Sequence, residues 1–213
     1  IGLSAAGGPA LLFYVLAYGV ATVGAFAIVS LVRERDSEGN VTGEALHIDQ
    51  WRGLGRRHPW LAGAMTLFLL SFAGIPLTGG FVGKFLAFAA AADGGAWPIV
   101  VVAVAASAAA AYIYIRIIVV MFFSAPVRQG EALPELLAAD AVGPAMEIGG
   151  GTATATATAL APVATAVQRT AVAVRPGILT EVAIWVCALG TFFLGFFPGP
   201  VVDLLQQAVR FVV

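Results

Sequence analysis

An apolar stretch that is too long for one straight membrane helix, residues 60–92, most constrains how this chain can fold. At a rise of about 1.5 Å per residue it would form a helix of roughly 50 Å, whereas the hydrocarbon core of a bilayer is about 30 Å thick. Its centre holds a proline, which cannot donate a backbone hydrogen bond, and glycines, which tolerate non-helical backbone. These helix-breaking residues are Gly74, Pro76, Gly79 and Gly80. We therefore predict a helix over 60–92 that is broken near 75–80.

The only lysine of the chain, Lys84, follows this break by about one helical turn. It precedes the end of the second half-helix by about eight residues, or roughly 12 Å. A charge at that depth is costly and usually faces a bundle interior or a hydrated cavity, and broken helices that line a cavity are typical of transporters. Lys84 is therefore the first candidate for a functional residue. The alternative is a lysine whose stem lies along the helix and whose ammonium group reaches the interface.

The composition is that of a polytopic membrane protein. The chain is 60% hydrophobic and 11% charged, with a mean hydropathy of +0.95, whereas soluble domains are about 45–50% apolar and about a quarter charged. A net charge of −1 argues against a nucleic-acid partner. The single cysteine, Cys187, excludes an intrachain disulfide and any cysteine-ligated cluster within this chain. His47 and His58 lack metal-ligand spacing, so we predict no metal site.

Three further apolar segments are long enough to cross a bilayer, and they lie at about residues 9–32, 97–123 and 179–197. With the broken helix they predict an all-α membrane protein with four transmembrane helices. The residues after the last span, 198–213, begin with Pro-Gly-Pro and predict an amphipathic tail along the membrane surface.

The two long loops differ in composition but share basic residues. Residues 33–59 form a charged loop with five arginines. Residues 124–177 carry three arginines, a glycine run and a Thr-Ala repeat, and contain too few large apolar residues for a core, which predicts a flexible low-complexity loop. The turn at 93–97 has no lysine or arginine. The positive-inside rule therefore places both long loops in the cytoplasm and both ends of this stretch outside.

Several polar residues within the predicted spans are candidates to support the lysine. Tyr14, Tyr18 and Thr22 recur every four residues and form one stripe on the first span. The stripe either lines a hydrated path or, at Tyr14, belongs to the aromatic belt of the interface. Thr78 lies within the break. Arg116 cannot release a proton at any accessible pH, so it either tunes the local field or snorkels to the interface.

Four segments resemble one known family, in the same order along the chain. Residues 71–85, SFAGIPLTGGFVGKF, closely resemble the broken twelfth helix of the antiporter-like subunits of respiratory complex I, most closely the subunit N branch. The other segments are YVLAY at 14–18 with GAFAIVS at 24–30, WRGLGRRHP at 51–59, and YIYIR at 112–116. The resemblance covers nearly everything except residues 124–177. It implies the last four of fourteen helices in a larger antiporter-like bundle of the bacterial cell (inner) membrane.

The resemblance also implies a function. The lysine at the position of Lys84 carries protons in the membrane arm of NADH:quinone oxidoreductase, coupling electron transfer elsewhere in the complex to proton pumping. No cofactor and no redox chemistry are expected in this chain, whereas FMN, iron–sulfur clusters and quinone are expected in other subunits. The expected partners are other membrane-arm subunits, especially neighbouring antiporter-like subunits, and the lipid bilayer. Two alternatives stay open: a subunit of a multisubunit sodium/proton antiporter, and a structural membrane scaffold.

The charge partner of Lys84 is not evident in the sequence. Desolvation disfavours a charged lysine and a nearby anion favours it, so its charge state can be switched by its surroundings. Within the predicted spans no acid is placed to pair with it, because Glu181 lies near a helix start, where the macrodipole already favours an anion. The chain opens at Ile1 without a methionine, so we expect the partner upstream in a longer protein.

Overall fold

The computed structural model describes residues 7–35, 41–45, 48–124, 170–173 and 177–210. Its first part consists of α1 (Gly7–Leu31), β1 (Val32–Arg35), β2 (Val41–Glu44), the 3-10 helix η1 (Ile48–Trp51) and α2 (Leu54–Arg57). The central helices are α3 (Pro59–Ala73), α4 (Gly79–Asp93) and α5 (Trp97–Phe123). The last elements are β3 (Thr170–Ala173), α8 (Ile178–Phe196) and α9 (Pro198–Arg210).

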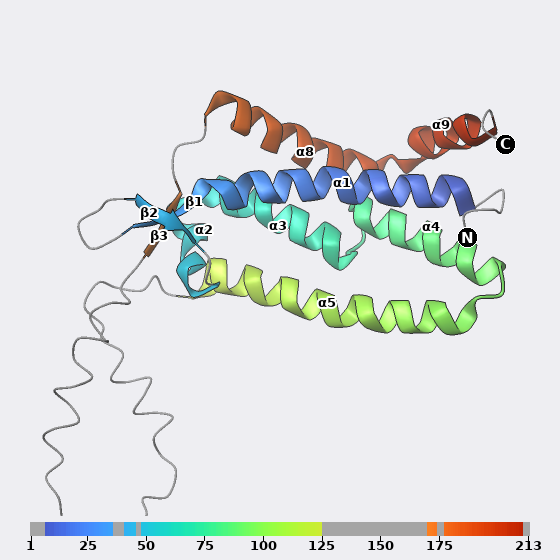
Figure 1. Ribbon diagram of the computed structural model, residues 1–213, viewed down its shortest axis with the longest axis horizontal. Helices are drawn as coiled ribbons and strands as arrows, with labels where there is room; N and C mark the ends of the chain where they lie inside the picture. The colour runs from blue at the N-terminus through green and yellow to red at the C-terminus, as the bar shows by residue number, and fades with distance from the viewer. Residues whose placement is uncertain (1–6, 36–40, 46–47, 125–169, 174–176, 211–213) are drawn as a thin grey trace, which may run out of the picture.

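The helices confirm the predicted membrane architecture. In the described part of the chain, α1, α5 and α8 are long and apolar enough to cross a membrane. The predicted span over 60–92 is split into α3 and α4, which have 15 residues each and lie end to end along α1 (Figure 1). Each half is too short to cross alone, so together they supply the fourth crossing.

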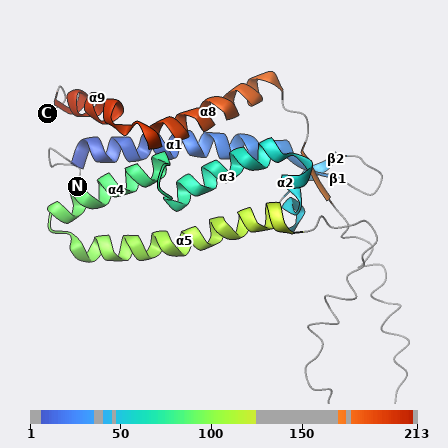
Figure 2. The same cartoon turned by 180° about the vertical axis from the view of Figure 1, so that it is seen from behind.

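The central helix of the bundle is α1. Both Figure 1 and Figure 2 show α8 on one side of it and the α3–α4 pair on the other, with α5 packed outside α3. Close packing at the centre depends on Gly24, because a Cβ atom there would lie 2.8 Å from the Cβ atom of Cys187 and would collide with the Phe68 ring. The lone cysteine is thus a buried packing residue between α1 and α8.

Two groups of buried apolar side chains hold the helices together. The larger joins α1, α3, α5 and α8, and its fully buried members include Ile28, Leu61, Phe68, Met121 and Ile184. The smaller consists of Phe13, Ala17 and Leu194, with apolar residues of α4 and α9 packed against it. The break between α3 and α4 touches this second group, since a Cβ atom on Gly79 would lie 3.0 Å from Leu194 and 3.5 Å from Ala17.

A small antiparallel sheet, which the sequence did not predict, joins the two long loops. Its strand order is β2-β1-β3, and β1 follows α1 without a turn. Arg33 lies opposite Glu44 of β2, and Val32 opposite Ala173 of β3. Within the predicted flexible low-complexity loop over 124–177, residues 170–173 form a strand. It is too short for a recognisable period in the sequence and forms by pairing with distant residues. The rest of that loop, 125–169 and 174–176, lies outside the described residues.

The predicted amphipathic tail is helical over α9. Its residues Val201, Val202 and Leu205 pack toward α1 and α8, whereas Asp203 and Gln206 are exposed. The helix starts at Pro198, a residue whose fixed φ suits the first helical position. Residues 211–213 of the predicted tail lie outside the described residues.

Candidate functional site

The break begins where α3 ends on Gly74. This glycine has φ 78°, and its N–H donates to the carbonyls of Leu70 and Ser71 at 3.1 and 3.0 Å, while the N–H of Ile75 donates back to Leu70 at 3.1 Å. A left-handed residue that closes a helix in this way is usually glycine, because a side chain is strained in that conformation. The chain therefore turns sharply out of the helix at this residue.

The proline then leaves a carbonyl without a helical partner. In a continuous helix the carbonyl of Phe72 would accept the N–H of residue 76, which is Pro76 and has no N–H to give. The carbonyl of Ala73 would accept from Leu77, which instead adopts φ 75° outside the helix. Two acceptors at the negative end of α3 are thus available to another donor.

The second half-helix starts at Thr78, which was a candidate supporting residue. Its backbone is extended, and its side-chain oxygen accepts the N–H of Phe81 at 3.4 Å, as an N-cap does. The hydroxyl also donates to the carbonyl of Ile75 at 2.7 Å. Thr78 therefore starts α4 and holds the link to it, which is a structural role at the site.

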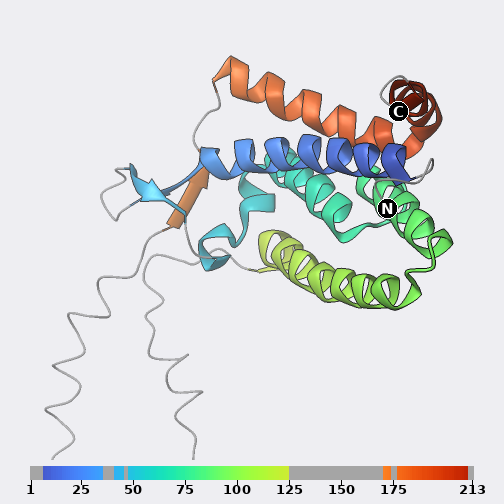
Figure 3. The same cartoon turned by 45° about the vertical axis from the view of Figure 1, so that its right-hand side comes forward.

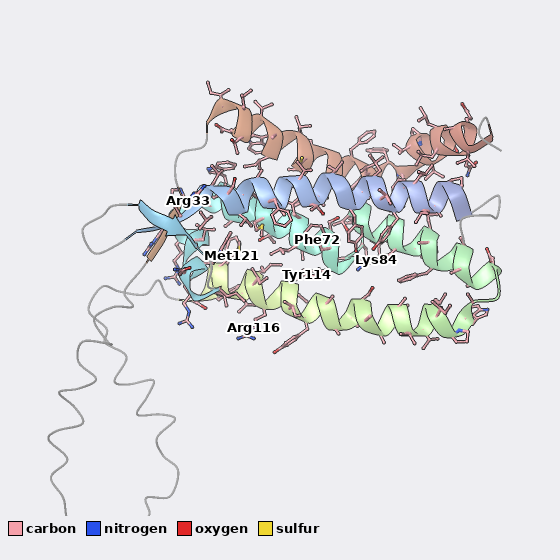
Figure 4. All side chains as sticks on the ribbon, viewed as in Figure 1. Arg33, Phe72, Lys84, Tyr114, Arg116 and Met121 are labelled. Atoms are coloured by element: carbon pink, nitrogen blue, oxygen red, sulfur yellow. The ribbon has the colours of Figure 1, made fainter. Side chains whose placement is uncertain are left out.

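Lys84 meets the two available carbonyls. Its Nζ atom donates to the carbonyl of Phe72 at 2.7 Å and to that of Ala73 at 3.4 Å. The side chain is half-buried and lies between the helices (Figure 4). The negative end of a helix macrodipole favours a cation, so the broken helix itself supplies polar surroundings for the ammonium group. Among the described residues its hydrogen-bond partners are backbone oxygens, and the upstream charge partner stays a prediction.

A cluster of aromatic rings adjoins the lysine at Tyr18. The hydroxyl of Tyr18 donates to the same Phe72 carbonyl at 3.2 Å, and Lys84 Nζ lies 5.9 Å from the centroid of the Tyr18 ring, within reach of a cation–π contact. Tyr14 stacks on Tyr18 at 4.4 Å between centroids. The Phe72 ring lies 5.8 Å from the rings of both Tyr18 and Tyr114. The stripe predicted on the first span thus reaches the lysine at Tyr18, with Tyr14 stacked behind it.

Two candidate supporting residues are not brought to the lysine. Thr22 is half-buried one turn beyond Tyr18, and in the described part of the chain it is not hydrogen-bonded to the lysine or to its two carbonyls. Arg116 is exposed and extends from the side of α5 that faces away from the other helices, whereas Tyr114 on the same helix points inward (Figure 4). Position along a helix placed both residues at a suitable depth, but only the packing of the helix determines which side faces the site.

The predicted glycines of the break allow close backbone contacts. A Cβ atom on Gly74 would lie 3.3 Å from Lys84 Nζ. On Gly79 it would lie 3.3 Å from the Thr191 carbonyl, and on Gly80 it would collide with the Ser71 carbonyl. The sequence did not point to the Phe72 and Ala73 carbonyls, because every residue has a carbonyl. The signal that could have found the first of them is Pro76, which lies four residues after Phe72 and has no N–H to donate to it.

No group of three or more histidine, cysteine or acidic side chains that could hold a metal ion occurs among the described residues. His58 instead precedes α3, where its carbonyl accepts the N–H of Ala62 at 3.0 Å. His47 lies outside the described residues.

These features define a transporter-like membrane protein, in which irregular backbone lines a site for a charge. They are the bundle of apolar helices, the broken helix and the lysine bonded to the carbonyls that the break leaves free. The chain belongs to the NADH:quinone oxidoreductase/Mrp antiporter transmembrane family, whose model matches residues 1–110. The family resemblance found in the sequence is therefore confirmed.

Named relatives extend the match over the whole chain. It is 51% identical over 213 residues to NADH-quinone oxidoreductase subunit N of Beutenbergia cavernae, covering 100% of this chain and 33% of that protein. Subunit N of Thermobifida fusca is 41% identical over 192 residues, which are 90% of this chain and 27% of that protein. A chain of respiratory complex I from Thermus thermophilus with bound aureothin matches with a TM-score of 0.61 at 27% identity, over 92% of this chain and 34% of that chain. This chain thus spans between about a quarter and a third of the length of the curated relatives it matches.

Proposed function

We propose that this chain is the carboxyl-terminal part of a subunit N and that it carries protons through Lys84 in the membrane arm of NADH:quinone oxidoreductase. The observation that carries this proposal is the lysine ammonium group 2.7 Å from the carbonyl that Pro76 leaves free. A cation held by backbone dipoles rather than by a fixed acid can release its proton without leaving an unpaired carboxylate behind. The 51% identity to a subunit N favours this assembly over a sodium/proton antiporter.

Tyr18 keeps the site satisfied when the lysine changes charge. The Phe72 carbonyl accepts from both Lys84 and Tyr18, and a carbonyl oxygen has two lone pairs. If Lys84 becomes neutral and its bond weakens, the Tyr18 hydroxyl still occupies the carbonyl, so the polar group is not left unpaired. When another charged group in the complex moves toward Lys84 or away from it, the equilibrium between the protonated and the neutral lysine shifts.

The whole protein is proposed to act as a translocase subunit in the bacterial cell (inner) membrane. Its partners would be the other membrane-arm subunits, especially the neighbouring antiporter-like subunits, and lipid. In this proposal the chain holds no cofactor, and FMN, iron–sulfur clusters and quinone belong to other subunits.

We propose that the loops 33–59 and 124–177 are cytoplasmic and that the ends of the stretch are outside. The pairing of β1 with β3 supports this topology, because it brings parts of both arginine-bearing loops into one sheet at one end of the bundle (Figure 3). The turn between α4 and α5 lies at the other end of the bundle, the end at which α9 also lies.

Purification of the full-length chain with its native partners tests the proposal. We expect it to bring down flavin, iron–sulfur clusters and quinone reductase activity in one assembly. Sodium-dependent proton exchange by an assembly that lacks these groups would instead establish the antiporter, which the family description also covers. A scaffold would show neither activity.

A Tyr18→Phe substitution should weaken but not abolish proton transport. It removes the hydroxyl that donates to Phe72 and keeps the ring beneath the lysine. One hydrogen bond is worth about 0.5–1.5 kcal/mol net, so we expect a loss of roughly threefold to tenfold in the proton transport rate of membrane vesicles. Tyr112→Phe is the matched control, because Tyr112 is 70% exposed on α5. Equal rates for the two variants would contradict a role for the Tyr18 hydroxyl.

A further inference from the structure

Ser71 is a buried polar residue to which neither the sequence nor the mechanism above gives a role. It lies in the last turn of α3 with 1% of its surface exposed. Its Oγ atom accepts the N–H of Gly80 at 3.0 Å. The first N–H groups of a helix have no partner within that helix, so a side chain of α3 satisfies a backbone donor of α4. The two half-helices are thereby joined directly, across the link that separates them in sequence.

This bond and the bonds of the lysine connect the same two helix ends. Gly80 precedes Lys84 by four residues, so the two lie one above the other on one face of α4. On α3, Ser71 comes directly before Phe72 and Ala73, whose carbonyls accept the bonds of the lysine. The start of α4 is therefore held to the end of α3 at two points about one turn apart, and the bond at Ser71 helps to set how α4 lies relative to the carbonyls.

The other contacts at the break do not replace this bond. Thr78 bonds to Ile75 and Phe81, and so lies within the link and α4. The backbones come so close at Gly80 that a Cβ atom would collide with the Ser71 carbonyl. Removal of the Ser71 hydroxyl would leave the N–H of Gly80 buried without its acceptor, and the start of α4 would lose its hydrogen bond to α3.

We propose that Ser71 is a positioning residue for Lys84: its hydroxyl fixes the start of α4 so that the lysine ammonium group meets the free carbonyls at the end of α3. This inference rests on the proposed function of Lys84 in proton transport. It assigns to Ser71 the alignment of the site, and not a step in the transfer of the proton.

The test compares Ser71→Ala and Ser71→Thr in the full-length chain within its assembled complex in native membranes. The measurements are the amount of assembled complex, the electron-transfer rate and the number of protons pumped per electron pair. We expect Ser71→Ala to assemble and to lower proton pumping about threefold to tenfold, as loss of one hydrogen bond would. Ser71→Thr keeps the hydroxyl and should restore pumping to within about twofold of the wild type.

A matched control lies on the same helix. The Thr66 hydroxyl donates to the carbonyl of Ala62 at 2.8 Å, within α3 and away from the break. Thr66→Ala should therefore pump like the wild type. If Ser71→Ala fails to assemble, Ser71→Cys, which has nearly the same size and is a weak acceptor, is expected to assemble and to pump at an intermediate rate.

Three results would overturn the inference. Normal pumping by Ser71→Ala or by Ser71→Cys at normal assembly would show that the bond does not align the lysine. Equal losses in Ser71→Ala, Ser71→Thr and Thr66→Ala would show a packing effect of α3. Lys84→Met in the same membranes separates the two proposals. Normal pumping by Lys84→Met would contradict the proposed function of the lysine. Impaired pumping by Lys84→Met together with normal pumping by Ser71→Ala would contradict only the role of Ser71.

Discussion

Replacing Lys84 by methionine should stop proton transport through this subunit while the complex still assembles. Methionine keeps an unbranched apolar stem of similar length and removes the ammonium group that bonds to Phe72 and Ala73. A positioned proton-transfer group contributes a factor of about 10²–10⁴, so we expect transport through this subunit to fall about a hundredfold or more. Proton pumping and electron transfer in native membranes, with assembly measured separately, test this expectation.

The arginine variant separates proton transfer from charge alone. Lys84→Arg keeps a cation whose donors can still meet the carbonyls at the end of α3, but an arginine does not release its proton. If Lys84 is a relay, this variant should assemble well and pump as poorly as the methionine variant. If the lysine only anchors the helix through these bonds, arginine should replace it and pumping should stay close to that of the wild type.

A control for the new side chain is available on the same helix. Phe85 follows the lysine directly and is 62% exposed, so Phe85→Met introduces the same residue on another face of α4. Wild-type pumping by Phe85→Met and by both lysine variants would exclude Lys84 from the mechanism.

The elements that the sequence predicted are those determined by local composition. Long apolar runs gave the helices α1, α5 and α8 to within about two residues at each end. Pro76 and the glycines around it predicted the break, because each of them acts on its own backbone or on the residue four before it. The depth of Lys84 in the bilayer, which was counted along the helix, stays a prediction.

The features that the sequence did not predict depend on contacts between distant residues. The strand β3 forms only by pairing with β1, some 135 residues earlier. The orientation of Arg116 depends on which side of α5 packs against α3, and an alanine- and valine-rich helix has no polar face that would indicate it. The role of Ser71 could not be predicted for the same reason. A serine in an apolar helix becomes informative only when the structure shows Gly80 beside it.

The largest structural effect should come from a single methyl group at Gly80. An alanine there would place its Cβ atom against the carbonyl of Ser71, 2.7 Å from the carbonyl carbon and 2.8 Å from Oγ. Backbone atoms of a packed helix cannot move aside as a flexible side chain can, so α3 and α4 would have to separate. Overpacking of this kind costs about 1–3 kcal/mol or more, and the gain of about 0.5–1 kcal/mol from replacing a helical glycine does not offset it.

The separation would also act on the lysine. Gly80 and Lys84 share one face of α4, so moving the start of that helix away from α3 lengthens the bond from Lys84 to the Phe72 carbonyl. We therefore expect Gly80→Ala to lower both the thermal stability of the complex and its proton pumping. Matched controls are Gly63→Ala on α3 and Gly19→Ala on α1, because in the described part of the chain a Cβ atom at either position has no neighbour within 4 Å.

These controls should change stability in the opposite direction. With no collision, an alanine in a helix is favoured over glycine, so Gly63→Ala and Gly19→Ala are expected to leave the complex as stable as the wild type or slightly more stable. The measurement is the fraction of complex that remains assembled after heating in detergent, read together with pumping in membranes. A Gly80→Ala complex that matches the two controls in both measurements would mean that α3 and α4 do not approach as closely at Ser71 as the structure describes.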